Sequence, residues 1–402
     1  MAVLSVADAL AMVLAQAQPL PSEPAPLADA VGRVLAGDLA ALRTQPPADV
    51  SAMDGYAVRA EDVAAPAVLR VVAEIAAGQP SDRVVGRGEA ARIFTGAVMP
   101  AGADTVVIQE VTSRDGDSVA IKRPEARGRH LRRQGYDFKQ GDMLLEKGRR
   151  LSARDIALAG AMNHAAVAVH RRPRLVVFAT GDELVEPGTP PAPGQIVHSN
   201  GIALAALARG EGAHATDFGI VPDRLDATVA AVRRAREAGV DVLVTSGGAS
   251  VGDYDFVQQA FAAEGMALSF WKVALRPGRP LMHGKLGGMQ VLGLPGNPVS
   301  AYVCAILFLV PLLRRLAGRS DLTPPRESAL LGCALAANDE RADYMRATLE
   351  CRPDGTKIAT PFPAQDSSLL VPLAHAHCLL VREPFAPAAV PGSPCVILNL
   401  QF

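Results

Sequence analysis

The chain has 402 residues, of which 49% are hydrophobic, 20% charged and 4% aromatic, and its formal net charge is −1. This length exceeds one compact core and predicts roughly two to four domains. A nearly neutral chain gives no electrostatic support for a protein dedicated to nucleic acid or to a membrane surface. Its five cysteines have no C-x-x-C spacing, which is typical of free thiols in a reducing compartment, so we expect a cytoplasmic protein without a zinc site.

The apolar N-terminal segment, residues 1–17, is predicted to be a helix and not a secretory signal. The first basic residue is Arg33, and Asp8 interrupts the apolar run, whereas a signal needs a positively charged start. Ser5 followed by Asp8 is typical of a helix N-cap.

Residues 41–140 carry short β-rich runs separated by Gly, Pro and Asp turns, which predicts a mostly β module. Two stretches stand out there: 51–57, which contains Asp54, and 93–104, which contains Thr95; both also fit ordinary turns. The basic segment 122–139 could contact RNA, but few aromatic residues are interleaved with its charges. A solvated face or an anion-binding edge is therefore favoured. A helix around 152–161 and a short β-like run follow.

Residues 174–320 alternate strand and helix patterns, which predicts a parallel sheet covered on both faces. Strands are expected at the start of 174–184 and over 241–245 and 289–294. Helices are expected over 200–210, with Asn200 as the cap, and over 223–238, 253–264 and 297–318. The apolar run 299–313 is short for a membrane span and contains Pro311, so we expect a buried helix. The tail, 322–402, is predicted to be a small β domain.

Glycine-rich loops at 180–184, 246–255 and 293–300 each follow a predicted parallel strand, so they are expected to converge on one rim of the sheet. A fourth such loop covers 275–280. Acidic residues there suit Mg²⁺, and basic residues and glycine amides suit phosphate or another oxyanion. This mixture predicts phosphoryl or nucleotidyl chemistry, with a structural salt-bridge network as the alternative. The acidic and basic residues are Asp182, Glu183, Asp223, Asp253, Asp255, Lys272, Arg276 and Arg279.

Three other site types find no support in the sequence. The chain has no G-x-x-x-x-G-K-[ST] motif, so a P-loop nucleotidase is excluded. Ser246 and Ser250 have no accompanying His and Asp signature for a hydrolase triad. His375 and His377 lack a third metal ligand at suitable spacing.

Taken jointly, five motifs resemble the MoeA family of molybdopterin molybdenumtransferases, which is related to the catalytic domains of gephyrin and plant Cnx. These are S-A-M-D-G-Y-A-V-R, I-F-T-G-A-V-M-P-A-G-A-D-T-V-V, T-G-D-E-L, T-S-G-G-A-S-V-G-D-Y-D and G-L-P-G-N-P-V-S. They occur in the family's order and, with weaker matches, span roughly residues 50 to 370. The resemblance implies insertion of molybdate into adenylylated molybdopterin, with release of AMP and a requirement for Mg²⁺. Interaction with a molybdopterin adenylyltransferase and with molybdoenzymes is also implied.

The resemblance further implies an elongated homodimer with a multidomain α/β plus β fold. A Rossmann-like three-layer molybdopterin-binding domain would comprise 1–21 and 174–321, and a linking domain 22–40 and 140–173. A β-rich domain would comprise 41–139, and a small C-terminal β-barrel 322–402. The active site would lie between the β-rich domain of one subunit and the molybdopterin-binding domain of the other.

Site residues are carried over by motif match. The site acids and hydroxyls are Asp54, Thr95, Asp137, Glu183, Asp223, Ser250 and Asp255, and the expected Mg²⁺ ligands among them are Glu183, Asp223 and Asp255. Residues expected at the pterin and molybdate pocket are Gly247, Gly248, Lys272, Arg276, Arg279, Pro295, Asn297, Pro298, Ser300, Arg346 and Ser367 or Ser368.

One departure from the family pattern is R-P-G-R-P, Arg276 to Pro280, where the family usually shows K-P-G-K-P. Arginine keeps the charge and can bind oxyanions through two nitrogens, so retained function is expected with altered anion geometry. The alternatives are a molybdopterin adenylyltransferase and a non-catalytic pterin-binding scaffold. The first is disfavoured because Ala249 to Gly252 replace the adenylyltransferase pattern, and the second because no partner-binding extension is evident.

Overall fold

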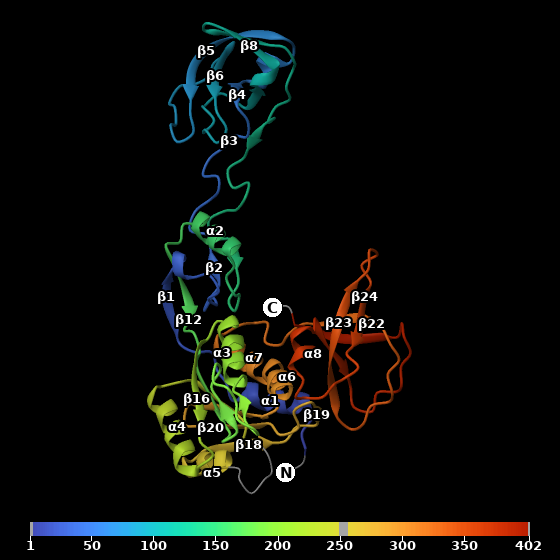
Figure 1. The fold of residues 1–402 in the computed structure, drawn as a ribbon. Helices are drawn as coiled ribbons and strands as arrows, with labels where there is room; N and C mark the ends of the chain where they lie inside the picture. Colours follow the sequence, from blue (N-terminus) through green and yellow to red (C-terminus); the bar gives the residue numbers. More distant parts are fainter. Residues whose placement is uncertain (1–2, 249–255, 401–402) are drawn as a thin grey trace.

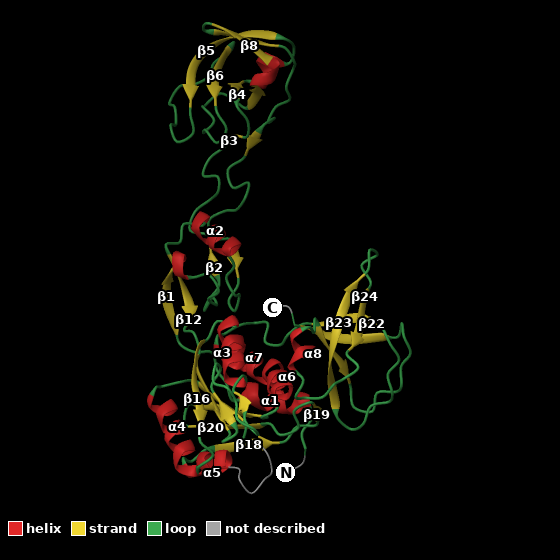
Figure 2. Ribbon diagram, viewed as in Figure 1, coloured by secondary structure: helices red, strands yellow, loops and turns green. Residues whose placement is uncertain are grey.

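The computed structural model describes residues 3–248 and 256–400. It shows an α/β domain that carries a long arm on one side and a β-barrel on another (Figures 1 and 2). The arm consists of a slender linking segment and a β module at its far end. This arrangement agrees with the predicted multidomain α/β plus β fold.

The α/β domain is built on a six-stranded sheet. In sheet order its strands are β16 (His214–Val221), β13 (Arg174–Thr180), β17 (Val242–Ser246), β21 (Met289–Leu294), β20 (Met282–Leu286) and β18 (Ala267–Trp271). The first four are parallel. The strand β20 runs antiparallel to β21 and to β18, so β20 alone among the six runs in the opposite direction. The parallel sheet that the sequence predicts is therefore interrupted by β20, which a tight turn joins to β21.

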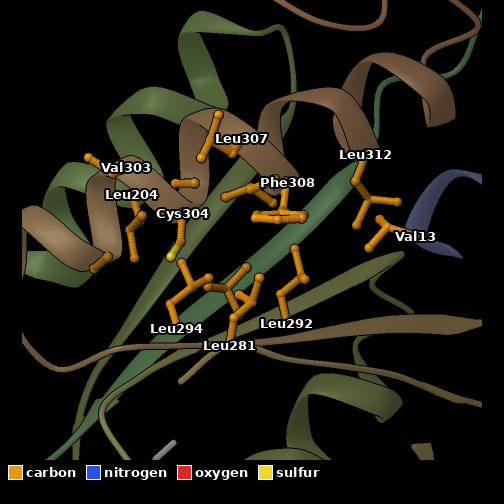
Figure 3. Packing of buried hydrophobic residues seen from close by; sticks show 14 of the residues in the cluster. Val13, Leu204, Leu281, Leu292, Leu294, Val303, Cys304, Leu307, Phe308 and Leu312 are labelled. Carbon is orange, nitrogen blue, oxygen red and sulfur yellow. The ribbon is translucent and has the colours of Figure 1, made fainter. Parts of the chain in front are cut away.

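Helices cover both faces of this sheet. They are α1 (Val6–Ala15), α3 (Asn200–Gly210), α4 (Leu225–Glu237), α5 (Phe256–Ala263), α6 (Pro298–Cys304), the π-helical turn η4 (Ala305–Leu309) and α7 (Val310–Leu316). Leu292 and Leu294 pack against Phe308 and Leu312 on one face (Figure 3). Phe178 and Val291 pack against Phe261 on the other, where α4 and α5 lie. Ser5 caps α1 by accepting the backbone N–H of Asp8, as predicted.

Within the part of the chain that the structure describes, the helical run Pro298–Leu316 is long and apolar enough to cross a membrane, but 89% of its apolar 18-residue stretch is buried inside the protein. It agrees with the predicted buried helix. The π-helical turn precedes Pro311, because proline cannot donate the backbone hydrogen bond of a regular helix.

The linking segment pairs two distant parts of the chain. Its elements are β1 (Ser22–Pro26), which pairs with β12 (Ala166–His170), β2 (Leu39–Ala40), which pairs with β11 (Met143–Leu145), and the helix α2 (Ala153–Ala161). Ser152 and Asp155 form a capping box at the start of α2. The segment therefore holds the outgoing and returning strands of the arm together.

The β module at the end of the arm has its own six-stranded sheet. In sheet order its strands are β7 (Thr105–Ile108), β4 (Gly55–Val58), β6 (Glu89–Ile93), β5 (Ala67–Ile75), β9 (Ser118–Ile121) and β8 (Thr112–Asp115), and β3 (Val50–Ser51) pairs separately with β10 (Leu131–Arg132). Its apolar cores are separate from that of the α/β domain.

The C-terminal part is a closed barrel of five strands. Around the barrel they are β23 (Ala342–Cys351), β24 (Lys357–Pro361), β22 (Arg326–Leu331), β26 (Pro394–Asn399) and β25 (Cys378–Arg382), which pairs again with β23. The strand β19 (Leu275–Arg276) extends from the α/β domain and pairs with β23. The helix α8 (Leu370–Ala374) lies where the barrel meets the α/β domain (Figure 1).

Candidate functional site

A cleft of ≈ 730 Å³ lies at the carboxyl ends of β13, β17 and β21. Backbone or side-chain atoms of the three predicted rim loops line it. Of the predicted site residues, those in its lining are Glu183, Asp223, Gly247, Gly248, Pro295, Asn297, Pro298, Ser300 and Ser368. The convergence that the strand pattern predicts is therefore present in the fold, in the place where ligands bind open α/β sheets.

One wall of the cleft is acidic. The carboxylate of Glu183 folds back over Gly181, where an added Cβ would lie 2.6 Å from a carboxylate oxygen. The backbone N–H of Asp223 donates to the Asp182 carboxylate at 3.1 Å, which holds the loops after β13 and β16 together. The pKa of Asp223 is raised by partial burial and by the negative charges of Asp182 and Glu183. This wall has an excess of negative charge that a bound cation would relieve.

The glycines after β17 are required by packing and by backbone conformation. Gly247 and Gly248 have φ angles of 95° and 62°, in the left-handed region that favours glycine. An added Cβ would lie 2.6 Å from the carbonyl oxygen of Thr180 at Gly247 and 2.2 Å from Val257 at Gly248. The loop therefore lies directly against the end of β13 and the start of α5.

Asn200 joins two of these loops. Its Nδ2 donates to Ser246 Oγ at 2.8 Å and to the carbonyl of Gly296 at 2.7 Å. The prediction that Asn200 caps α3 was wrong: Ser199 is the N-cap residue and Asn200 is the first residue of the helix. Because both hydrogen bonds come from its side-chain amide, Asn200 links the end of β17 to the loop after β21.

The barrel contributes a loop to the opposite side of the cleft. Asn297 Nδ2 donates to Ser367 Oγ at 2.8 Å, and the backbone N–H of Val299 donates to the carbonyl of Ser367 at 3.1 Å. Ser368 lines the cleft, and its hydroxyl donates to Asp366. Ser367 therefore lies beside the cleft and positions α6.

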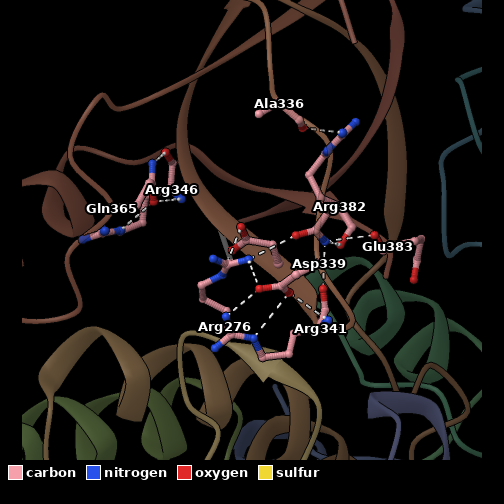
Figure 4. A network of polar contacts seen from close by, with 10 residues as sticks. Arg276, Ala336, Asp339, Arg341, Arg346, Gln365, Arg382 and Glu383 are labelled. Carbon is pink, nitrogen blue, oxygen red and sulfur yellow. Dashed lines mark hydrogen bonds and ion pairs between the residues drawn. The ribbon is translucent and has the colours of Figure 1, made fainter. Parts of the chain in front are cut away.

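Arg346 is not exposed to the cleft. It is 1% exposed and donates to Gln365 Oε1 and to the carbonyl of Leu369 (Figure 4). Burial lowers the pKa of its guanidinium. In this chain Arg346 fastens the loop that carries Ser367 and Ser368.

The other three basic residues predicted at the pocket, Lys272, Arg276 and Arg279, also lie outside the cleft lining. Arg276 reaches towards the barrel, 3.1 Å from the Asp339 carboxylate and from Asn338 Oδ1, and 3.5 Å from Asp343 (Figure 4). Lys272 Nζ lies 5.0 Å from the centre of the Trp271 ring. Arg279 is exposed.

Asp54, Thr95 and Asp137 belong to the arm and are not in the cleft lining. Asp54 Oδ1 accepts both the backbone N–H and the hydroxyl of Thr95 at 2.7 Å, and these bonds lower the pKa of Asp54. Asp137 is exposed near the base of the β module, where its backbone N–H donates to Gln45. Within one chain the arm holds this group away from the cleft (Figure 1).

Two predicted site residues, Ser250 and Asp255, lie outside the described residues, as do Asp253 and Ala249 to Gly252. Within the described ranges, no group of three or more His, Cys, Asp or Glu side chains is arranged to hold a metal ion. Of the three expected Mg²⁺ ligands, the cleft wall therefore presents Glu183 and Asp223.

A buried histidine at the cleft was not predicted. His198 lines the cleft, and its Nε2 lies 3.1 Å from Asp217 Oδ2. No motif pointed to it, because its partner lies 19 residues away on β16. The position of His198 directly before α3, at the same rim, is the one signal that could have found it.

Comparison with known proteins identifies the family. Residues 4–162 match the model of the MoeA N-terminal region (domain I and II), residues 176–315 a probable molybdopterin binding domain, and residues 328–399 the MoeA C-terminal region (domain IV). The chain belongs to the MoeA family. This confirms the resemblance seen in the motifs and gives the protein a role in molybdenum cofactor biosynthesis.

Individual relatives match this member of the MoeA family along most of its length. Molybdopterin molybdenumtransferase 2 of Mycobacterium tuberculosis is 39% identical over 84% of this chain and 86% of its own. The molybdopterin molybdenumtransferase of Haemophilus influenzae is 34% identical, over 89% and 88% respectively. The crystal structure of a molybdopterin biosynthesis MoeA protein from Pyrococcus horikoshii superposes with a TM-score of 0.85 at 30% identity, covering all of both chains.

Proposed function

We propose that this MoeA-family chain inserts molybdate into adenylylated molybdopterin in the cytoplasm and releases AMP. The observation that carries the proposal is the cleft at the strand ends, which combines an acidic wall with a glycine-rich loop. The relatives named molybdopterin molybdenumtransferase support the same reaction. The cleft has a volume of ≈ 730 Å³, which is large enough to hold a small-molecule ligand.

The acidic wall fits a divalent cation. Glu183 and Asp223 are oxygen donors of the type that Mg²⁺ prefers, and the raised pKa of Asp223 reflects crowding of negative charge that such an ion relieves. When bound, Mg²⁺ would supply charge neutralisation at the phosphoanhydride. Asp182 holds the loop of Asp223 in place, and Gly181 leaves room for the Glu183 carboxylate. Asp255 remains a further candidate ligand.

The substrate's remaining contacts are assigned to the rim loops. Gly247 and Gly248 allow the backbone to approach an oxyanion, and Pro295, Pro298 and Ser300 line the same cleft. Lys272, Arg276 and Arg279 lie outside it, so a role in anion binding requires them to turn towards the ligand. Molybdate is a tetrahedral dianion and suits the same donors as phosphate.

The complete site is proposed to form between two copies of the chain. Asp54, Thr95 and Asp137 are presented on the arm, away from the cleft of the same chain. A homodimer in which the β module of one subunit reaches the cleft of the other would bring them to the substrate. Within this arrangement Thr95 keeps Asp54 ionised and oriented.

The test is to supply adenylylated molybdopterin, Mg²⁺ and molybdate, and to measure AMP release and pterin-bound molybdenum. We expect both products to depend on molybdate. Glu183→Gln is expected to lower the rate by at least about 100-fold. Glu237→Gln, an exposed change on α4, serves as the matched control. Neither product forming with the wild-type protein would refute the proposal.

A further inference from the structure

A buried pair, His198 and Asp217, supports the beginning of α3. The His198 side chain is 2% exposed, and its Nε2 lies 3.1 Å from Asp217 Oδ2. The other oxygen of Asp217 accepts the backbone N–H of Gly219 at 2.8 Å. The backbone N–H of His198 donates to the carbonyl of Val185. These bonds fix His198 between β14 (Leu184–Val185) and β16.

The first turn of α3 packs directly onto this pair. An added Cβ at Gly201 would lie 2.6 Å from Asp217 Oδ2 and 2.8 Å from His198 Cε1. Real Cβ atoms do not approach other atoms so closely, so any larger residue would displace either the helix or the pair. The close approach at Gly201 therefore ties the position of the first turn of α3 to the pair.

The beginning of α3 is also where the cleft is held together. His198, Ser199 and Asn200 all line the cleft. The Asn200 side-chain amide joins Ser246 to Gly296, in addition to the backbone pairing of β17 with β21 and the contact from Ser246 Oγ to the Pro295 carbonyl. Since His198 and Asn200 are two residues apart, a shift of the histidine moves the amide out of reach of its partners. Hydrogen bonds are sensitive to such shifts because they weaken steeply with poor geometry.

The pair is favoured in its charged form. The hydrogen bond to Asp217 raises the pKa of His198, helped by the nearby charge of Glu186 and opposed by burial. Burial acts to raise the pKa of Asp217, but its bonds from His198 and Gly219 and the charges of His198 and Arg209 lower it overall. Arg209 lies on α3, and Glu186 follows β14, so the charged groups around the pair come from each element packed against it.

We propose that His198 is a positioning residue for the molybdopterin cleft, which acts through Asn200 and needs Asp217 as its partner. This inference rests on the proposed function of the cleft. The imidazole does not itself have to touch the substrate. It holds the start of α3 so that the Asn200 amide fixes the Ser246 hydroxyl and the carbonyl of Gly296, which follows the last paired residue of β21, in the positions that the substrate requires.

The test compares His198→Leu, which removes the donor, with His198→Gln, which retains an N–H without a titratable charge. His198→Leu is expected to raise KM for adenylylated molybdopterin about ten-fold, with a smaller change in kcat. His198→Gln is expected to restore only part of this loss, because it keeps a hydrogen-bond donor but not the positive charge. His214→Leu, which removes an exposed histidine at the start of β16, is the matched control and is expected to change neither constant.

Two further measurements separate positioning from general destabilisation. In a double-mutant cycle, His198→Leu added to Asn200→Ala is expected to cost little beyond Asn200→Ala alone, because both act through the same contacts. The KM of the wild-type protein is expected to rise as pH passes above the raised pKa of His198, whereas His198→Gln loses this component. If His198→Leu does not fold, the pH comparison with His198→Gln decides.

The outcomes are distinct. Suppose that the wild-type protein is active. If His198→Leu then has the wild-type KM, or if the effects of His198→Leu and Asn200→Ala are additive, this inference is overturned and the proposed function stands. For the Gln variant, a pH profile identical to wild type would also contradict it. A wild-type protein that releases no AMP would overturn the proposed function, and the inference with it.

Discussion

Arg346→Met is expected to release the barrel loop that borders the cleft and to lower the free energy of unfolding by about 2–4 kcal/mol. The guanidinium is almost fully buried and donates to the carbonyl of Leu369 and to Gln365, on either side of Ser367 and Ser368. Methionine is similar in length and apolar, so it fills the space but removes the guanidinium donor. The Leu369 carbonyl loses this donor, and Gln365 Oε1 keeps only the backbone N–H of residue 346.

The magnitude follows from the contacts. The bonds to the Leu369 carbonyl and to Gln365 Oε1 measure 3.1 and 3.3 Å, and the contact with the Ala364 carbonyl is longer, at 3.5 Å. Hydrogen bonds to charged groups contribute about 1.5–3 kcal/mol each, so the two shorter bonds contribute about 3–6 kcal/mol. The variant no longer has to bury a charged guanidinium. This gain offsets part of the sum, so that a net loss of about 2–4 kcal/mol remains.

Urea unfolding followed by circular dichroism measures the loss, and hydrogen exchange locates it. The amide of Val299, which donates to the Ser367 carbonyl, is expected to exchange faster in the variant. Arg352→Met, at an exposed site in the same barrel, is the control and is expected to change stability by less than about 0.5 kcal/mol. A loss in Arg346→Met no larger than in the control, with unchanged exchange at Val299, would refute this reasoning.

Three further predictions test the packing and charges around the site. Gly248→Ala is expected to lower the free energy of unfolding by at least about 2 kcal/mol more than Gly239→Ala does. Both glycines have positive φ, but only at Gly248 would the new Cβ clash, with Val257. Equal losses of stability in urea titrations would contradict this. Glu211→Gln is expected to cost about 3–5 kcal/mol, since it leaves the buried Arg314 and Arg319 without their shared carboxylate; thermal unfolding no different from wild type would disprove it. Asp217→Asn is expected to remove the stability that the charged pair contributes. This contribution is full at pH values between the ordinary pKa values of Asp and His, and it is lost as pH falls through the lowered pKa of Asp217 or rises through the raised pKa of His198. If the difference in free energy of unfolding between wild type and variant does not change with pH, the charged pair is contradicted.

Local sequence patterns predicted the helices and the central strands well. The helix expected over 200–210 and the strand expected over 289–294 match α3 and β21. In both cases hydrophobic spacing and flanking glycines act within a few residues. The edge strand β18 and its neighbour β20 were missed, because β20 contains a glycine and a lysine and its pairing is set by the turn to β21.

The site was predicted less completely, because its key contacts join distant parts of the chain. Asn200 looked like a helix cap, but its partner Ser246 is 46 residues away. Asn297 and Ser367 are 70 residues apart and belong to different domains. Arg276 matched a motif position in the binding loop, yet carboxylates of the barrel draw its side chain away. Motif matching therefore located the rim but did not determine where each side chain points.

The central claim is that the cleft of one chain works with the Asp54 group of another, and a subunit-mixing experiment tests it most directly. Asp54→Asn and Glu183→Gln are each expected to be nearly inactive in AMP release with molybdate. After the two variants are unfolded together and refolded, random pairing should restore about a quarter of wild-type activity, since half of the dimers would carry one intact composite site. Activity that remains at the level of the separate variants, in a mixture shown to contain hybrid dimers, would contradict the account.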